Sequence, residues 1–259
     1  MKICVSGKGG VGKTTFAGTL ARLLARDGLD IIAIDADLDH NLRSTLGLGR
    51  EKVENLTPLS EMKDLIKDRT GADPDAYGSV FRLNPAVSDL PQKLWVDGPD
   101  NIKFILMGTM KKGGAGCACP ANVLLKSFLK YMFLKDYNVI IDMEAGIEHL
   151  GRGTAKYADG IIIIVEPTHN SIETAKRIIN MSEDIGLMKV YVVGNKIANA
   201  EEEGFIREHF DDVLGIIPFD HKVREAEMDG TALVDFTASA AVEAISEIKD
   251  LLKKMESTT

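Results

Sequence analysis

The chain has 259 residues, of which 45% are hydrophobic, so it holds enough apolar material for one large domain spanning residues 1–259. Its net charge of −8, with basic and acidic residues evenly mixed, argues against the clustered cations that nucleic acids require. These properties exclude nucleic acid as a principal partner.

Short apolar runs rich in valine and isoleucine alternate along the chain with segments of helical periodicity. Runs that are apolar on both faces are typical of parallel strands covered by helices. The alternation predicts an α/β fold with a doubly wound, mostly parallel central sheet flanked by helices. The expected strands are residues 2–6, 31–35, 102–107, 137–142, 160–165, 190–194 and 213–218, and the expected helices are 14–26, 120–134, 171–185, 201–209 and 239–255.

The stretch 47–101 is irregular and contains several prolines, which predicts an insertion on the edge of the sheet. One helix is expected in it, capped by Thr57 and opened by Pro58. Met1 leads directly into an apolar strand, without a charged leader or a stretch long enough to span a bilayer. We therefore expect a cytoplasmic protein with no stable membrane anchor.

A glycine-rich run joins the first expected strand to the first expected helix in the pattern of a P-loop. Its glycines let backbone N–H groups converge on phosphate oxygens, and the helix N-terminus adds its dipole. Lys13 supplies a positive charge to the outer phosphates, and Thr14 offers a hydroxyl to magnesium. The run predicts a site for ATP/ADP and Mg2+ made by Gly9, Gly10, Val11, Gly12, Lys13, Thr14 and Thr15.

A second lysine in this loop, Lys8, is not needed to hold phosphates bound to its own chain. With it the loop resembles that of the deviant Walker A (SIMIBI) ATPases, which include MinD, ParA, the nitrogenase iron protein and metal-cofactor maturation ATPases. In that family the early lysine reaches across a two-fold interface to the partner's nucleotide. The resemblance implies a MinD-like homodimer induced by ATP, metal or both, with Lys8 and Lys13 as catalytic residues; a solvated surface lysine is the alternative.

Carboxylates follow the second expected strand, at the edge of the sheet where open α/β folds bind ligands. They can hold magnesium waters or orient an attacking water. The family pattern places water positioning and a magnesium contact on Asp37, with Asp35 nearer the metal shell. Asp39 and Asn41 are equally compatible with solvating a turn.

The strand expected at 137–142 ends in Asp142, which matches the Walker B aspartate of the family and is expected to take magnesium through water. Gly146 follows in the second switch segment, where its N–H could sense the terminal phosphate. His149 is either a metal ligand or polar surface. Two later strand ends carry Asn195 and Pro218, and the resemblance places adenine recognition on Asn195 with Pro218 alongside; ordinary turns are the alternative.

Three cysteines are a sparse set, and in a reducing compartment thiols are mostly buried fillers, metal ligands or redox groups. Cys4 lies in an apolar strand and is expected to be a filler. Cys117 and Cys119 are two residues apart, so in extended backbone both sulfurs face one side. Two thiolates are too few for a soft metal, but a two-fold dimer supplies four. A strained disulfide is the rival interpretation.

The Cys-Ala-Cys-Pro run and the second switch segment 144–154 closely resemble those of the CooC ATPases, which mature nickel-containing carbon monoxide dehydrogenase. The resemblance implies an ATP-hydrolysing metallochaperone that holds Ni2+ or Zn2+ between Cys117 and Cys119 of two subunits. Its client would be apo carbon monoxide dehydrogenase or a related nickel enzyme such as acetyl-CoA synthase. An iron–sulfur cluster carrier or electron-transfer ATPase and a MinD/ParA-like positioning ATPase remain the alternatives.

Overall fold

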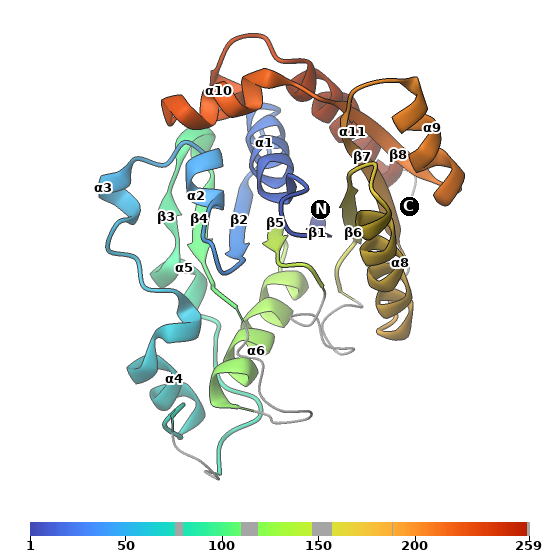
Figure 1. Cartoon of the computed structure of the whole chain (residues 1–259). Coiled ribbons are helices and arrows are strands. Elements are labelled where there is room, and N and C mark those ends of the chain that lie inside the picture. Colours follow the sequence, from blue (N-terminus) through green and yellow to red (C-terminus); the bar gives the residue numbers. More distant parts are fainter. Residues whose placement is uncertain (76–79, 110–118, 147–156, 188, 258–259) are drawn as a thin grey trace.

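The computed structural model describes residues 1–75, 80–109, 119–146, 157–187 and 189–257 (Figure 1). At its centre lies an eight-stranded sheet with the order β3-β4-β2-β5-β1-β6-β7-β8. Neighbouring strands are parallel except for β3 and β4, which pair antiparallel at one edge. The strands are β1 (Lys2–Gly7), β2 (Ile31–Ala36), β3 (Val96–Asp97), β4 (Lys103–Leu106), β5 (Asn138–Met143), β6 (Gly160–Val165), β7 (Val190–Ile197) and β8 (Val213–Pro218).

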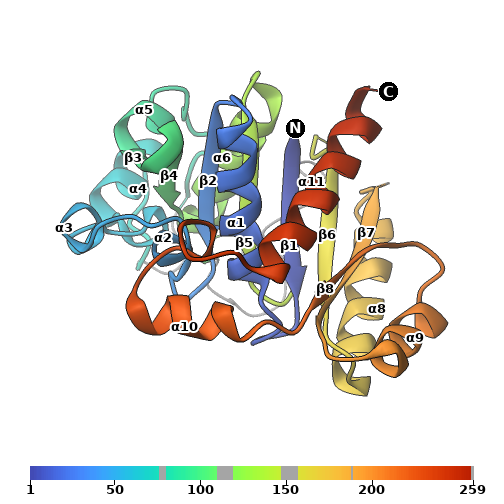
Figure 2. The same cartoon turned by 90° about the horizontal axis from the view of Figure 1, so that it is seen from above.

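Helices cover both faces of this sheet, and one apolar core lies on each face. Figure 2 shows α1 and α11 side by side over one face, while α6 and α8 pack into the core of the other. The helices are α1 (Lys13–Arg26), α2 (Leu42–Thr45), α3 (Arg50–Val53), α4 (Lys63–Thr70), α5 (Leu90–Leu94), α6 (Pro120–Leu134), α8 (His169–Asp184), α9 (Ala200–His209), α10 (His221–Asp229) and α11 (Ala240–Ser257), with 3-10 turns η1 (Leu59–Glu61), η2 (Pro99–Asn101) and η3 (Leu233–Asp235).

The α/β fold class with a doubly wound, mostly parallel sheet is confirmed. The expected strands and helices are present, with ends that differ by up to three residues. The helix expected to open at Pro58 is wrong: a single 3-10 turn follows that proline, and α4 begins only at Lys63. Helix α10 and the short edge strand β3 are present as well and were not predicted from the sequence.

Residues 47–101 supply β3 and the short helices beside it, so this segment does reach the edge of the sheet. Its status as an insertion, and the single domain over 1–259, stay predictions. Among the helices of the described residues, none is long and apolar enough to cross a membrane.

Strand register places the candidate site. Asp35 on β2 pairs with Asp142 on β5, and Val5 on β1 pairs with the same aspartate. The carboxyl ends of three adjacent strands therefore meet at one edge of the sheet, beside the first turn of α1. Helix α1 is anchored there because Phe16, Leu20 and Leu24, spaced by four residues, are buried against the sheet.

Candidate functional site: a phosphate-binding loop at the sheet edge

Gly7 and Gly12 shape the loop between β1 and α1. Gly12 has a φ of 97°, and a Cβ there would lie 2.4 Å from Nδ2 of Asn195. Gly7 has a φ of 150°, and its Cβ would lie 2.4 Å from the carbonyl oxygen of Ile164. A side chain at Gly7 would press on the backbone of β6, and a side chain at Gly12 would displace the amide of Asn195.

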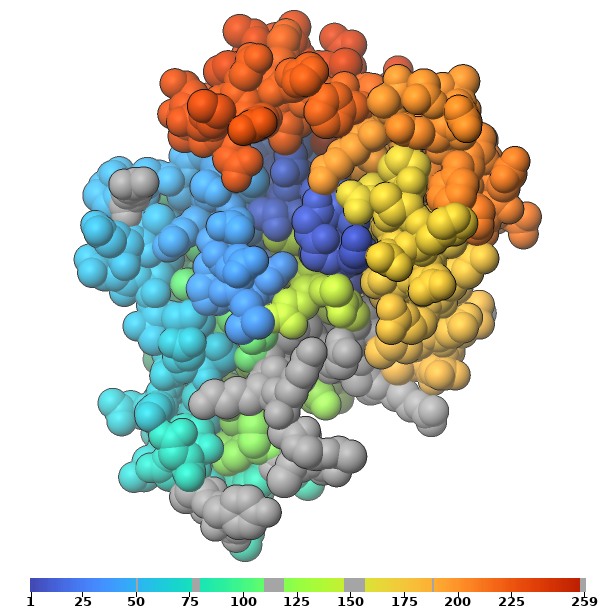
Figure 3. Space-filling model, in the orientation of Figure 1, coloured from blue at the N-terminus to red at the C-terminus, as the bar shows by residue number. Residues whose placement is uncertain are grey.

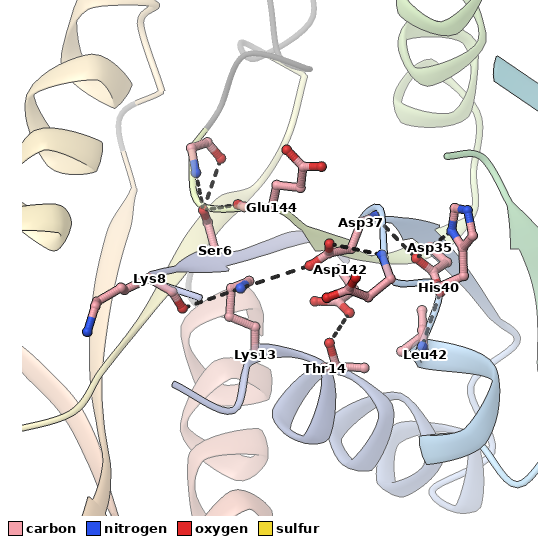
Figure 4. A network of polar contacts seen from close by, with 12 residues as sticks. Ser6, Lys8, Lys13, Thr14, Asp35, Asp37, His40, Leu42, Asp142 and Glu144 are labelled. Atoms are coloured by element: carbon pink, nitrogen blue, oxygen red, sulfur yellow. Dashed lines mark hydrogen bonds and ion pairs between the residues drawn. The ribbon is translucent and has the colours of Figure 1, made fainter. Parts of the chain in front are cut away.

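The two lysines of the loop point in different directions (Figure 4). Lys13 is buried; its Nζ donates to the carbonyl oxygen of Lys8 at 3.4 Å and lies 4.0 Å from the carboxylate of Asp37. Lys8 instead extends away from these carboxylates, and its Nζ lies 3.5 Å from the carboxylate of Glu166. Of these two lysines, Lys13 is the one that faces the acidic end of its own chain's site.

Asp142 is fully buried at the end of β5. Its Oδ2 accepts a hydrogen bond of 2.6 Å from the hydroxyl of Thr14, whereas its Oδ1 has no hydrogen-bond partner among the described residues. Burial raises the pKa of this carboxyl to about 7, with Asp35 and Asp37 adding to the shift while Thr14 and Lys13 oppose it. A buried carboxylate with one open oxygen, beside a hydroxyl and a second carboxylate, fits a hard divalent cation such as Mg2+.

Asp35, also fully buried, holds the loop that follows β2. Its two oxygens accept the backbone N–H groups of Asp37 at 3.2 Å and Leu42 at 3.1 Å. His40 in the same loop has a φ of 50°, and Asp35, 4.0 Å from its Nδ1, raises the pKa of the imidazole above its usual value. The carboxylate therefore shapes the loop that presents Asp37, rather than lying open to a ligand.

Ser6 connects the start of the phosphate loop to the segment after β5. Its buried hydroxyl accepts the N–H of Gly146 at 3.2 Å and lies 2.9 Å from the carbonyl oxygens of Glu144 and Gly146 (Figure 4). The Gly146 N–H, expected from sequence to meet a terminal phosphate, is thus directed to Ser6 in this state. A phosphate that recruits it would have to break this contact.

A cavity of about 860 Å³ opens in front of the loop. In the space-filling view, the N-terminal atoms in dark blue reach the surface at the centre of one face, below α10 in orange (Figure 3). Of the predicted site residues, Val11 is buried behind the cavity, and Asp39 and Asn41 line its rim. The lining also includes Gly9, Gly10, Gly12, Lys13, Thr14, Thr15 and Asp37 from the predicted site, and Leu48, Val223, Glu227, Thr231 and Leu233 from α2, α10 and the residues around them.

The residues predicted to recognise adenine lie outside this lining. Asn195 donates from Nδ2 to the carbonyl oxygen of Val11 at 2.7 Å, and Lys196 donates to that of Gly10 at 2.6 Å. Both side chains therefore hold the phosphate loop from behind. Pro218 ends β8 without contributing to the cavity wall. The predicted role of Asn195 and Pro218 in recognising adenine stays a prediction.

The cysteines have separate settings. Cys4 is completely buried, and burial raises the pKa of its thiol to about 12, which fits a filler. Cys119 is a free, partly exposed thiol at the N-cap of α6, where its Sγ accepts the N–H of Asn122 at 3.4 Å. Cys117 and His149 lie outside the described residues, as do residues 147–154 of the switch segment. Within the part that is described, no three His, Cys, Asp or Glu side chains form a metal-binding group.

A parallel doubly wound sheet, a glycine loop entering a helix, and a threonine–aspartate pair beside a buried lysine together define a P-loop nucleoside triphosphatase. The chain belongs more narrowly to the CobQ/CobB/MinD/ParA nucleotide-binding family, since a profile of that domain matches residues 2–234. The protein is therefore an ATPase that works with ATP, ADP and Mg2+.

Comparison with individual proteins agrees with this assignment. The chain is 41% identical to the carbon monoxide dehydrogenase accessory protein CooC of Rhodospirillum rubrum over 261 residues, which covers 100% of this chain and 98% of that protein. Its fold is similar to MinD of Pyrococcus horikoshii complexed with Mg-ADP (TM-score 0.67, 20% identity, 98% and 96% of the two chains). It is also similar to a plasmid partition protein of Borrelia burgdorferi bound to AMPPNP (TM-score 0.69, 17% identity, 98% of each chain). The resemblance inferred from the motifs is confirmed.

Several residues at the site were missed from the sequence. Ser6, Glu166 and Lys196 make contacts with segments far away in the chain, and no spacing pattern indicates such contacts. The α10 wall was missed because this helix buries only Ala226 and so lacks an apolar stripe.

Proposed function

We propose that this ATPase is a homodimeric metallochaperone that delivers Ni2+ to apo carbon monoxide dehydrogenase or a related nickel enzyme. The observation that supports it best is the 41% identity with a carbon monoxide dehydrogenase accessory protein across the whole chain. The site described above binds ATP, and hydrolysis of this ATP would supply the energy for such delivery.

In this proposal the phosphate loop holds the nucleotide through its backbone N–H groups, and Lys13 binds the outer phosphates. Thr14, Asp37 and Asp142 hold Mg2+, since their oxygens are already grouped and one oxygen of Asp142 is open. The ion neutralises charge that develops on the transferred phosphoryl group. Asp37, which lines the cavity and lies near Lys13, orients the attacking water.

The orientation of Lys8 supports the homodimer. This lysine points away from the carboxylates of its own site, which fits a residue that acts on another chain. In the proposed dimer Lys8 completes the nucleotide site of the partner, so hydrolysis is slow until two chains meet. Charge stabilisation and positioning lower the barrier, without a covalent intermediate.

The nickel site is proposed at Cys117 and Cys119 of both subunits, which together supply four thiolates. Cys119 is available for this role because its sulfur is partly exposed, is not in a disulfide and lies at the N-terminus of α6. Nickel here is cargo rather than a resident cofactor, and Zn2+ would occupy the same thiolates.

An anaerobic titration of reduced protein with Ni2+ tests the proposal. We expect sulfur-to-nickel charge-transfer absorption that saturates at one ion per two chains, with dimer mass measured by light scattering in the presence of ATP. The Cys117→Ala, Cys119→Ala double variant should lose this absorption, whereas Cys4→Ala should keep it. Binding equal to that of the double variant would refute the nickel site, and a cluster formed only with iron and sulfide would favour an iron–sulfur carrier.

A further inference from the structure

The loop lysine that points away from its own site makes a specific contact. We propose that Glu166 is a positioning residue that holds Lys8 on its own protomer and releases it when the ATP-bound dimer forms. Lys8 Nζ lies 3.5 Å from Oε1 of Glu166. The inference rests on the dimer of the proposed function, and it adds a residue that sets how readily this dimer forms.

The sheet fixes the position of Glu166. The residue directly follows β6, and β6 is paired with β1 in a register that sets Gly7 opposite Ile164. Two residues beyond that pair, the backbone N–H of Glu166 donates to the hydroxyl of Ser171 at 3.1 Å. Because this backbone anchor is independent of the carboxylate, the carboxylate can change partners without moving the strand.

A second lysine shares the same carboxylate. Lys196 Nζ lies 3.6 Å from Oε2 of Glu166 and donates to the carbonyl oxygen of Gly10 at 2.6 Å. Glu166 therefore lies between two ammonium groups. That of Lys196 is hydrogen-bonded to the phosphate loop, whereas that of Lys8 can move to another partner. When Lys8 departs, Lys196 remains to neutralise Glu166 and to hold Gly10, so the loop keeps its shape.

The contact opposes dimerisation because Lys8 cannot pair with its own Glu166 and reach the partner's phosphates at the same time. The two side chains are 37% and 20% exposed, so the pair is partly solvated. Such a pair changes an equilibrium constant by a factor of about 1.4 to 5. Formation of a symmetric dimer breaks two of them, so their removal should tighten the dimer by about 2- to 30-fold.

Sedimentation of the full-length protein with ATP and Mg2+ tests this, together with turnover measured against protein concentration. Glu166→Gln removes the charge and preserves the shape. We expect its dimer dissociation constant to fall by about 2- to 30-fold, and the protein concentration for half-maximal turnover to fall in parallel. The plateau of turnover should not change, because in the dimer Lys8 has already left Glu166, and Lys196 keeps its own bond to Gly10. A merely structural role would lower the plateau or the thermal midpoint.

Two further variants control the experiment. Glu173→Gln makes the same charge change on the exposed side of α8 and should leave the dimer constant unaltered. Glu166→Asp, which withdraws the carboxylate by one methylene, should tighten the dimer less than Glu166→Gln and serves if that variant folds poorly. If the wild type dimerises and Glu166→Gln has the same constant, the inference is wrong and the proposed dimer stands. If both stay monomeric with ATP, the proposed dimer fails and the inference fails with it.

Discussion

Because the pKa of Asp142 is raised, this carboxyl makes the nucleotide-free protein less stable as pH rises. The substitution Asp142→Asn should remove this pH dependence. Its folded pKa of about 7 lies above the ordinary value of 3.8, so the folded protein binds this proton more tightly than the unfolded chain does. The contribution of Asp142 to stability is therefore most favourable below pH 3.8 and is lost as pH rises toward 7.

The magnitude follows from these two values. At pH 5.5 the shift destabilises the folded protein by about 2 kcal/mol, and at pH 8 by about 4 kcal/mol. Asp142→Asn keeps the shape of the neutral acid and cannot ionise. Its stability advantage over the wild type should therefore grow by about 2 kcal/mol between pH 5.5 and pH 8, or about 4 to 8 °C in thermal midpoint for a chain of this size.

Thermal unfolding without nucleotide and with EDTA, at both pH values, measures this difference. Titrating groups that do not interact with Asp142 cancel because each variant is compared with the wild type at the same pH. Asp136→Asn, at an exposed position between α6 and β5, controls for the general loss of a negative charge. An advantage of Asp142→Asn that is equal at the two pH values would refute the reasoning. With Mg2+ and ATP the order should reverse, because the wild-type carboxylate then binds the ion and the amide does not.

Three further outcomes are expected. Asp37→Asn should lower ATP turnover by about 10²- to 10⁴-fold with little change in nucleotide affinity measured by equilibrium binding; an unaltered rate would remove its water-orienting role. Ser6→Ala should destabilise the nucleotide-free protein by about 1 to 3 kcal/mol, because the buried Gly146 N–H loses its acceptor. The thermal shift caused by a non-hydrolysable ATP analogue should be larger in that variant than in the wild type, and an equal shift would show that Gly146 stays with Ser6 when nucleotide binds. Arg22→Gln should lower the free energy of unfolding by about 3 kcal/mol, since buried Arg22 binds Asp100, Asp235 and the carbonyl oxygen of Leu46; Arg26→Gln, a half-exposed neighbour on the same carboxylates, should cost about 1 kcal/mol or less in urea titrations.

The parts of the fold that sequence could predict are those with a local signature. Parallel strands buried on both faces appear as continuous apolar runs, and the phosphate loop appears as a glycine pattern between a strand and a helix. Strand β3 escaped prediction because its two residues are too few to show alternation, and its antiparallel pairing depends on β4. The helix expected at Pro58 failed because Leu59 and Ser60 are buried, which favours a tight 3-10 turn at the edge of the sheet.

The residues of the candidate site also fall into those that the sequence predicts and those that it does not. Lys13, Thr14, Asp37 and Asp142 could be named because their roles follow from position relative to strand ends. Glu166 could not, because its partners Lys8 and Lys196 lie far from it in sequence and are brought near only by the pairing of β1 with β6 and of β6 with β7. Contacts of this kind depend on sheet register, which periodicity does not specify.

The connection between the proposed metal thiolate and the nucleotide site is short. Cys119 caps α6, α6 ends at Leu134, and β5 begins at Asn138 and carries Asp142 at its far end. A helix of this length spans about 22 Å and a six-residue strand about 20 Å. Because α6 leads the chain to the start of β5 and is about as long as that strand, the first residue of α6 is expected near the edge of the sheet where Asp142 lies. A change of nucleotide that moves the segment after β5 therefore acts within the same edge of the sheet as Cys119. In the proposed dimer, ATP hydrolysis is therefore expected to act on metal release through segments at this edge of the sheet.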